Sequence, residues 1–473
     1  MERYFILWNC KKRIAKHVTA FLFAGFHCFS INAAQAQLAE VQGTTIRNDS
    51  EVASASPAVQ EPWNVLGQMT NVTQFNPAFN SPYAGQNSLN PNSHSSETTD
   101  LTLFAGMRIA TGGELWINPE IDQGFGLNNS TGLAGYPNGE AYKVGANAPY
   151  LRLPRLFYRQ VFNLGGSRQS ITPAENRLGG TQAGDNVILT IGKFSVVDVF
   201  DTNSYAHDPR SDFLNWSIVD SGAFDYAADA WGYTYGGSIE WTQSWWTLRS
   251  GLFALSYTPN STILDTSFSE HEWVVELEER HQLLGHPGKV KLLGYSNQGR
   301  MGNYGSAVQL AQQTNNPADT ALVRRASSQS GFAINLEQQV TAELGIFSRA
   351  SMNQGKQETF EFTDINRSVS AGLAVSGGEW GRRDDTFGLS SVANGLSGAA
   401  RSYFAAGGMG VLVGDGQLPH YGMEKIIESY YSYSVRAVDH LLLTLDYQYV
   451  VNPAYNQDRG PVSIFGARLH KEF

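Results

Sequence analysis

Apolar and polar residues alternate along many short segments of the chain, and the segment 439–451 shows the pattern most clearly. One of its faces carries Leu441, Leu443, Leu445, Tyr447, Tyr449 and Val451, and the other carries Thr444, Asp446 and Gln448. Because successive side chains of a strand point to opposite faces, a period of two predicts β-strands.

Two other segments set charged residues against aromatic and aliphatic residues. The segment 271–282 places Glu272, Glu276, Glu278 and Arg280 opposite Trp273, Val275 and Leu277. The segment 424–436 places Glu424, Glu428 and Arg436 opposite Ile427, Tyr431, Tyr433 and Val435. Such rows favour a wet lumen on one face and a lipid wall on the other. A solvated sheet on a soluble core alternates as well, and is the alternative.

The same pattern predicts about sixteen strands joined alternately by short and long connections. They lie near 64–75, 98–110, 113–122, 152–163, 187–196, 231–243, 245–257, 271–282, 288–300, 329–341, 343–354, 367–377, 385–397, 424–436, 439–451 and 462–473. Outer-membrane barrels have short periplasmic turns and long outer loops, and a barrel of this size leaves an aqueous channel. We therefore expect an all-β, transmembrane antiparallel β-barrel with both ends on the periplasmic side. The connection 165–186 is long for a periplasmic turn.

The two ends of the chain carry targeting signals. Residues 1–36 combine a basic start, an apolar run over Val18–Ile31 and an Ala34-Gln35-Ala36 cleavage site, which predicts a signal peptide. Residues 37–62 are polar and predict a flexible periplasmic lead-in, so the barrel domain is expected to span 63–473. The last strand places Phe465, Leu469 and Phe473 on one face. We expect Phe473 to be read by the barrel-assembly machinery and the barrel to lie in outer-membrane lipid.

Composition narrows the function classes. Both cysteines, Cys10 and Cys28, lie in the leader, so disulfides and thiol chemistry are excluded for the mature chain. Removing the leader's five Lys/Arg and one acid from the totals of 33 and 43 leaves a formal charge of −14. That charge argues against a nucleic-acid partner, and with the two acid rows it predicts a preference for cations. After the leader no apolar run is long enough for a membrane helix.

The stretch 192–233 has neither the period of a strand nor that of a long helix. It reads GKFSVVDVFDTNSYAHDPRSDFLNWSIVDSGAFDYAADAWGY. Counting makes 197–230 the third outer loop, and a loop of this length without regular structure is usually functional. We expect it to fold inward and to narrow the channel with Asp198, Asp201, Asn203, Arg210, Asn215 and Trp216. Asp208-Pro209 also fits a plain turn, and Arg210 fits a structural pair with a loop carboxylate.

Neighbouring strands offer a second set of candidates on the channel wall. Glu114, Trp116 and Glu120 share one face of 113–122, Arg155 and Arg159 share one face of 152–163, and Arg108 lies late on the strand before. Sugar hydroxyls accept hydrogen bonds from guanidinium groups and donate to carboxylates, while a sugar ring rests on an aromatic face. Many weak contacts of this kind suit conduction. The alternative is that these charges only solvate a water-filled pore.

Catalytic and cofactor sites find no support in the residue spacing. The chain contains neither G-x-S-x-G nor H-E-x-x-H, and no EF-hand spacing accompanies the Asp-rich loop. The glycine-rich segment 405–416 has no following GK[ST] and favours loop packing. We therefore expect no enzyme, no cofactor and no metal. A barrel enzyme with a Ser/His/acid set and a plugged structural barrel are the alternatives.

Several long motifs resemble one family. The stretch 192–233 with the following TYG, together with WINPEIDQGFGL, GLAGYPNGEAYKVG, AAGGMGVLVGDG and DYQYVVNPAYNQDRGPVSIFGARLHKEF, is similar to the carbohydrate-selective outer-membrane porins, the OprB-like family. The resemblance covers Trp63 to Phe473. It implies a 16-stranded barrel in the Gram-negative outer membrane that passes small sugars and ions by passive diffusion. A general cation-preferring porin is the alternative, and a homo-oligomer stays open.

Overall fold

The fold is described from a computed structural model, which describes residues 60–473 apart from Tyr142. The predicted signal peptide and most of the predicted lead-in, residues 37–59, lie outside the described residues. Within the described part of the chain, no helix is long and apolar enough to cross a bilayer.

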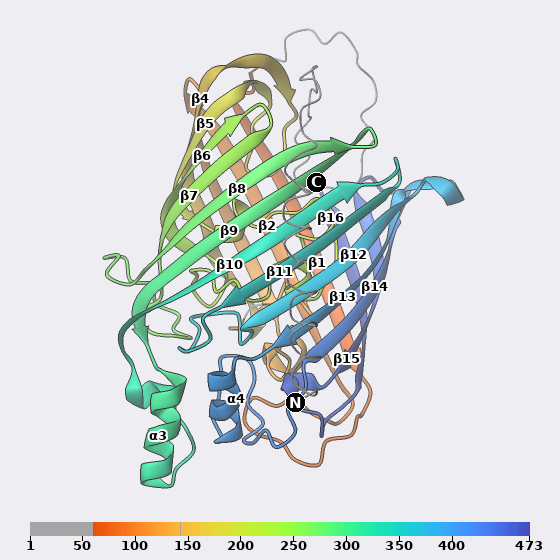
Figure 1. The fold of residues 1–473 in the computed structure, drawn as a ribbon. Coiled ribbons are helices and arrows are strands. Elements are labelled where there is room, and N and C mark those ends of the chain that lie inside the picture. Colours follow the sequence, from red (N-terminus) through yellow and green to blue (C-terminus); the bar gives the residue numbers. More distant parts are fainter. Residues whose placement is uncertain (1–59, 142) are drawn as a thin grey trace, which may run out of the picture. The chain divides into compact units, whose positions relative to one another are not determined.

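The described residues form sixteen strands (Figure 1). They are β1 (Trp63–Asn76), β2 (His94–Ala110), β3 (Gly113–Gly124), β4 (Ala146–Ile171), β5 (Gly180–Phe194), β6 (Thr234–Gln243), β7 (Trp246–Ala254), β8 (His271–Leu283), β9 (His286–Met301), β10 (Arg325–Gln339), β11 (Leu344–Asn353), β12 (Arg367–Gly377), β13 (Arg382–Gly395), β14 (Glu424–Ser434), β15 (Leu441–Val451) and β16 (Val462–Glu472). Short helices lie between them: η1 (Leu127–Ser130), η2 (Val196–Asp198), α2 (Trp216–Val219), α3 (Tyr304–Thr314), η3 (Thr320–Val323), η4 (Gly378–Trp380), α4 (Gly398–Ala405) and η5 (Pro453–Tyr455).

Every strand pairs antiparallel with its neighbours in sequence, and β1 closes the sheet by pairing with β16. Each predicted strand overlaps one of the observed strands, so the expected sixteen-stranded antiparallel barrel is confirmed. Closure leaves no open sheet edge around the barrel, which is the condition for a sheet to lie in lipid.

Long and short connections lie at opposite ends of the barrel, as predicted. The long connections are 77–93, 125–145, 195–233, 255–270, 302–324, 354–366, 396–423 and 452–461. The short ones are 111–112, 172–179, 244–245, 284–285, 340–343, 378–381 and 435–440. In outer-membrane barrels the short turns face the periplasm, so α3 and α4 in Figure 1 lie at the outer end.

The connection 165–186 is not the long turn that the sequence predicted. β4 continues to Ile171 and β5 begins at Gly180, so only 172–179 joins them. The added strand residues are mostly polar or glycine, and all of them except Asn186, which also pairs with Thr242 of β6, have partners only within the hairpin, for example Ser170 with Thr181. Their sequence LGGSRQSI lacks the apolar alternation that marks a lipid-facing strand, and the strand pattern was therefore missed.

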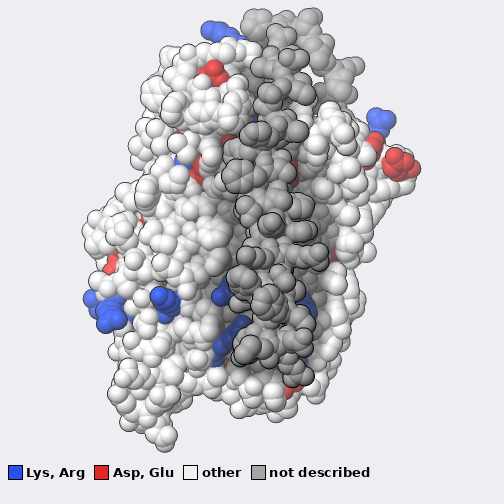
Figure 2. Space-filling view, in the orientation of Figure 1, with Lys and Arg blue, Asp and Glu red and all other residues white. Residues whose placement is uncertain are grey.

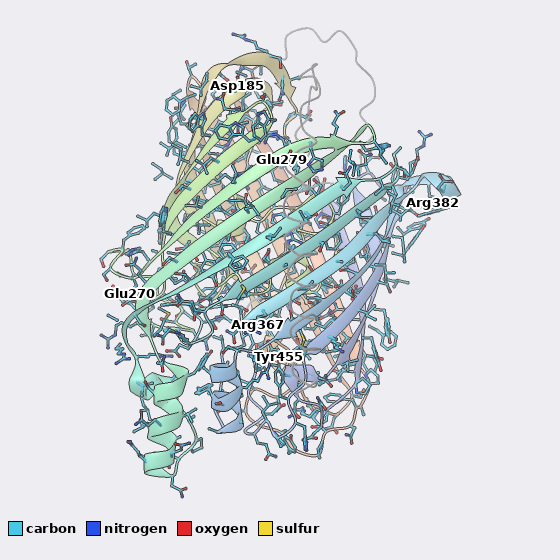
Figure 3. All side chains as sticks on the ribbon, viewed as in Figure 1. Asp185, Glu270, Glu279, Arg367, Arg382 and Tyr455 are labelled. Carbon is cyan, nitrogen blue, oxygen red and sulfur yellow. The ribbon has the colours of Figure 1, made fainter. Side chains whose placement is uncertain are left out.

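The outer face of the barrel is apolar between its two ends. Exposed side chains of the alternating rows include Leu445, Trp273, Ile427 and Phe465, whereas the polar residues between them are buried inside. Figure 2 shows charged side chains gathered toward the ends and a broad uncharged band between them. Figure 3 labels Asp185, Glu279 and Arg382 toward the short-turn end and Glu270 and Arg367 toward the long-loop end. This band fits the hydrocarbon layer of a membrane.

The third long connection, 195–233, lies inside the barrel, as expected. Its backbone N–H groups donate to carboxylates of the inner wall: Asp201 to Glu276 at 2.8 Å, Ser204 to Glu337 at 2.7 Å and Asn215 to Glu428 at 3.0 Å. This segment has little regular structure to satisfy its own backbone, so the wall must do so.

Two buried arginines hold the carbonyl groups of the same loop. Arg349 donates to the carbonyl oxygens of Ile218 at 2.8 Å and Ala206 at 2.7 Å, and Arg468 donates to those of Pro209 at 2.6 Å and Ser211 at 2.9 Å. Loop side chains also pack on the wall. Phe213 lies between Phe347 and Tyr430, with ring centroids 5.5 and 4.9 Å away. The loop is therefore a fixed inner layer on the β8–β16 side of the barrel.

The chain end completes the seam between β1 and β16. The backbone N–H groups of Gly67 and Phe473 each donate to the other residue's carbonyl at 2.8 Å. The Phe473 ring lies over Gly67, where an added Cβ would come within 2.4 Å of it, and its side chain is exposed on the lipid face.

Deleting Phe473 is expected to lower the yield of assembled barrel far more than it changes conductance. The deletion removes a seam contact and the lipid-facing terminal aromatic, but no lumen residue. Heat-modifiable migration of outer-membrane fractions measures the yield. Leu445→Ala, which also removes an exposed lipid-facing side chain, is the control and should assemble normally. Normal yield from the truncated chain would contradict the prediction.

Candidate functional site in the barrel lumen

The candidate site is built on two adjacent strands that carry complementary inward rows. Cross-strand register places Glu114 beside Arg159, Asn118 beside Arg155 and Glu120 beside Arg152. The inward-facing acids Glu114, Glu120 and Asp122 are buried in the wall. Apart from contacts at β4, this part of the wall lies away from the strands β8–β16, which hold most of the inward loop.

Arg152 was not predicted as a site residue, and the reason is a register shift. Strict alternation along 152–163 places Arg152 on the face opposite Arg155 and Arg159. Three residues of β3, Asn118 to Glu120, face four residues of β4, Arg155 to Arg152, next to Pro154. Such a bulge turns the strand locally and brings Arg152 to the inner face. There its guanidinium lies 3.2 Å from Asp122 and 3.9 Å from Glu120.

Guanidinium groups and aromatic rings stack in alternation along β4. Arg152 lies over the rings of Trp231 and Tyr233, at 4.9 and 5.5 Å from their centroids, and Arg155 lies over Tyr233 at 4.9 Å. Trp231 donates from Nε1 to the Tyr150 hydroxyl at 3.2 Å. Trp231 and Tyr233 end the inward loop, so the loop contributes the aromatic part of the stack and the wall contributes the cations.

Arg155 also fixes the start of the loop. It donates to the Asp198 carboxylate from Nε at 2.8 Å and from Nη2 at 2.6 Å. Asp198 in turn accepts from the Ser195 backbone N–H at 2.9 Å. Both predicted residues therefore meet at the lumen surface, where Asp198 keeps 28% of its side chain exposed.

Arg210 pairs with carboxylates from two loops. Its Nη2 lies 2.8 Å from Glu140 of the second long connection, and its Nη1 lies 3.6 Å from Asp208. The predicted alternative of a structural pair with a loop carboxylate is therefore observed. Burial raises the pKa of Glu140 to about 7, although Arg210 opposes the shift. Glu140 was missed because it lies in a different loop, far from Arg210 in sequence.

Asp201, Asn203, Asn215 and Trp216 lie in the loop as predicted but are buried. Asp201 accepts from the Ser221 backbone N–H at 2.6 Å, and Asn203 donates to Asn335 at 2.7 Å. Asn215 caps α2, whose first residue Trp216 stacks on Tyr136 at 5.4 Å. These four side chains hold the loop in place, and they are not offered to a passing solute.

Four predicted wall residues lie closer to the short-turn end. Glu114 accepts from Trp116 Nε1 at 3.1 Å and lies 3.5 Å from Arg108 and 3.9 Å from Arg159. Trp116 is fully buried. Arg108 donates to the carbonyl oxygens of Glu61 at 3.0 Å and Gly179 at 3.2 Å. This group joins the wall to the β4–β5 connection.

The acid rows on β8 and β14 do not face open water. Glu272, Glu276, Glu424 and Glu428 are all fully buried. Glu276 and Glu428 bind loop backbone, as described above, and Glu424 accepts from the N–H groups of Ala134 at 3.0 Å and Gly135 at 2.7 Å. The two acid rows therefore do not support a preference for cations, and only the charge of the whole chain still supports it.

The glycine-rich segment binds one of the protein's own carboxylates. The backbone N–H groups of Val411, Leu412 and Val413 donate to Asp364 at 3.3, 2.6 and 3.0 Å. Consecutive amides form an anion-binding concavity. Here Asp364 fills it, which agrees with the expected role in loop packing.

No described cluster of His, Cys, Asp and Glu residues has the geometry of a metal site. One hydroxyl, His and carboxylate series occurs: Thr70 lies 3.1 Å from His470 Nδ1, and His470 Nε2 lies 3.6 Å from Glu472. Thr70 and His470 are buried at the β1–β16 seam. No substrate carbonyl can reach that hydroxyl, so the series stabilises the seam.

Comparison with known proteins identifies a family and a similar fold. Residues 86–473 match the model of a family described as "Carbohydrate-selective porin, OprB family". OprB of Pseudomonas putida, in a high-pH structure, superposes with a TM-score of 0.66 at 14% identity, over 87% of this chain and 94% of that chain. DcaP of Acinetobacter baumannii gives a TM-score of 0.46 at 10% identity, over 92% and 100% of the two chains. A comparison with curated proteins gives no match.

The pair of Glu140 and Arg210 predicts a pH dependence near neutrality. Glu175, in the β4–β5 connection, is solvent-exposed inside the barrel, and the protein around it raises its pKa to about 7 by desolvation. As pH falls through 7 both carboxyls gain protons, so the lumen becomes more positive and relative cation permeability should fall. Reversal potentials in a salt gradient from pH 5 to pH 9 measure this change. The pH-dependent change in reversal potential should be smaller in Glu140→Gln and smaller again in the Glu140→Gln/Glu175→Gln variant. An unchanged pH dependence in the double variant would contradict the assignment.

Proposed function

The chain belongs to the OprB family of carbohydrate-selective porins, and we propose that it passes small solutes across the outer membrane by passive diffusion with a preference for sugars. As a member of this family with a closed sixteen-stranded barrel, it is an outer-membrane porin and a channel rather than an enzyme. A preference for sugars would depend on which residues line the lumen.

One observation carries the proposal: the alternating stack of Arg152 and Arg155 with Trp231 and Tyr233, beside the acids of β3. Guanidinium groups donate to sugar hydroxyls, carboxylates accept from them, and an aromatic ring supports the apolar face of a pyranose. The groups are already paired with one another, so each contact with a sugar replaces an existing one. The net gain per contact is then small, which permits release as well as binding.

The roles within this site follow from exposure. Arg152, Arg155 and Arg210 keep 11%, 11% and 13% of their side chains exposed. We assign solute contact to these three and to Asp198, and a positioning role to Glu120 and to the buried residues of the loop. Trp116, Arg159, Glu114 and Arg108 are proposed to shape the inner part of the path rather than its narrowest point.

Replacing Arg152 by Gln should weaken block of ion current by sugars. The variant loses hydrogen bonds to a charged group. Because each of these contacts replaces an existing one, we expect the low end of the roughly 1.5–3 kcal/mol range, or about tenfold in affinity. Titration of single-channel current with a panel of mono- and disaccharides measures the effect. Arg383 is an exposed arginine of β13 at the short-turn end of the barrel, so Arg383→Gln is the control and should leave sugar block unchanged. Equal block in wild type and Arg152→Gln would contradict the assignment, and absence of block by every sugar would favour a general porin.

Cation preference stays a prediction that now rests on the formal charge of −14 after leader removal, from 28 basic and 42 acidic residues. A lumen potential of that sign concentrates counter-ions. Reversal potentials at pH 7.5 under a tenfold salt gradient should indicate cation selectivity. Anion selectivity would mean that Arg152, Arg155 and Arg210 set the field at the narrowest point.

A further inference from the structure

The β4–β5 hairpin extends beyond the rest of the barrel at the short-turn end. β4 pairs with β3 only as far as Gln160, and β5 pairs with β6 only from Asn186 onward. The residues from Phe162 to Ile171 and from Gly180 to Asp185 have strand-pairing partners only on the other strand of the hairpin. Figure 1 shows β4 and β5 rising past their neighbours, and Figure 3 labels Asp185 on this extension. No other described short turn has such an extension.

The tip of this hairpin, residues 172–179, returns into the barrel. Asn118 donates from Nδ2 to Asn176 Oδ1 at 2.8 Å, and the Leu178 backbone N–H donates to Glu114 at 3.4 Å. Asn118 is an inward residue of β3, five positions from Gly113, which is about 16 Å along a strand. The tip therefore reaches well into the lumen from the periplasmic side.

Its conformation is fixed by its own contacts. Ala174 and Arg177 exchange backbone hydrogen bonds at 3.0 and 3.1 Å, and Asn176 takes the left-handed conformation with φ 57°. Leu178 is 2% exposed and belongs to the same apolar cluster as Trp116. The Gly179 carbonyl oxygen accepts a hydrogen bond from Arg108, and the Gly179 backbone N–H donates to the Glu61 carboxylate at 2.7 Å. The tip is thus anchored on both sides.

One acidic side chain of the tip lies near the inward loop. Glu175 is exposed to solvent although the tip lies within the barrel. The Gln68 amide group lies between Glu175 and Arg210. Oriented so that both neighbours are satisfied, it donates to Glu175 Oε1 at 2.7 Å and accepts from Arg210 Nε at 2.8 Å. Glu175 and Arg210 are therefore separated by a single amide group, although one comes from a periplasmic turn and the other from an outer loop.

We propose that the tip 172–179 is a second constriction on the periplasmic side of the inward loop, and that Glu175 and Asn176 form a further hydrogen-bonding site for the hydroxyls of small sugars. This inference rests on the proposed channel function. A solute that leaves Arg152 and Arg210 meets a carboxylate and an amide next. A row of weak sites, first cationic and then anionic, lets a sugar move from one site to the next without binding tightly at either.

The first experiment removes the tip and keeps the barrel. Because Ile171 and Gly180 already form a cross-strand pair, replacing 172–179 by Asn-Gly gives a two-residue hairpin of favoured geometry. Conductance in potassium chloride should rise roughly twofold, since backbone and side chains leave the pore lining. Unchanged conductance in a correctly inserted barrel would overturn the proposal. This readout uses no sugar, so it stands even if sugar preference proves wrong.

Point variants test the site if the shortened chain fails to assemble. Glu175→Gln should shift the reversal potential toward anions, and Asn176→Gly, which tolerates the left-handed backbone, should weaken sugar block. Glu379→Gln changes an exposed acid in η4, a short turn of the same end, and should alter neither quantity. If Glu175→Gln keeps the wild-type reversal potential and Asn176→Gly keeps the wild-type sugar block, the tip is only a structural brace and the proposal fails.

Discussion

A loop with little regular structure can lie inside a barrel only if the wall satisfies its backbone polar groups, because a buried unpaired N–H or C=O group is costly. The inner wall of this protein meets that condition with carboxyl and guanidinium side chains. Glu276, Glu337 and Glu428 accept from loop N–H groups, while Arg349 and Arg468 donate to loop carbonyls. Each of these side chains is in turn stabilised by the loop, so neither the inner wall nor the inward loop is stable in this form alone.

This arrangement divides the lumen chemically. The wall from β8 to β16 is largely covered by the loop, and its charges are occupied. On the β3–β4 wall Arg152 and Arg155 stay partly exposed at the lumen surface, where they meet the aromatic end of the loop at Trp231 and Tyr233. Selectivity is then set by a few partly exposed groups, and not by the total of inward charges.

The path is narrowed from both ends by segments that are each anchored to the wall. The loop enters from the outer side and the hairpin tip from the periplasmic side, and they approach each other through Arg210, Gln68 and Glu175. Anchored segments give a fixed constriction rather than a swinging gate. A fixed constriction suits passive diffusion, which needs a stable size limit and weak, repeated contacts.

The sequence by itself determined the barrel: the period of two gave the strands and their faces, and the order of short and long connections gave the place of the inward loop. These properties are local, because each strand must show an apolar face to lipid and a polar face to the lumen. Only the tertiary structure decided which inward residues a solute can reach. Glu428 and Arg152 both point inward, but loop packing from distant residues buries the first, and a bulge beside Pro154 turns the second to the lumen. The hairpin extension was also hidden, since strands that pair only with each other in water need no apolar alternation.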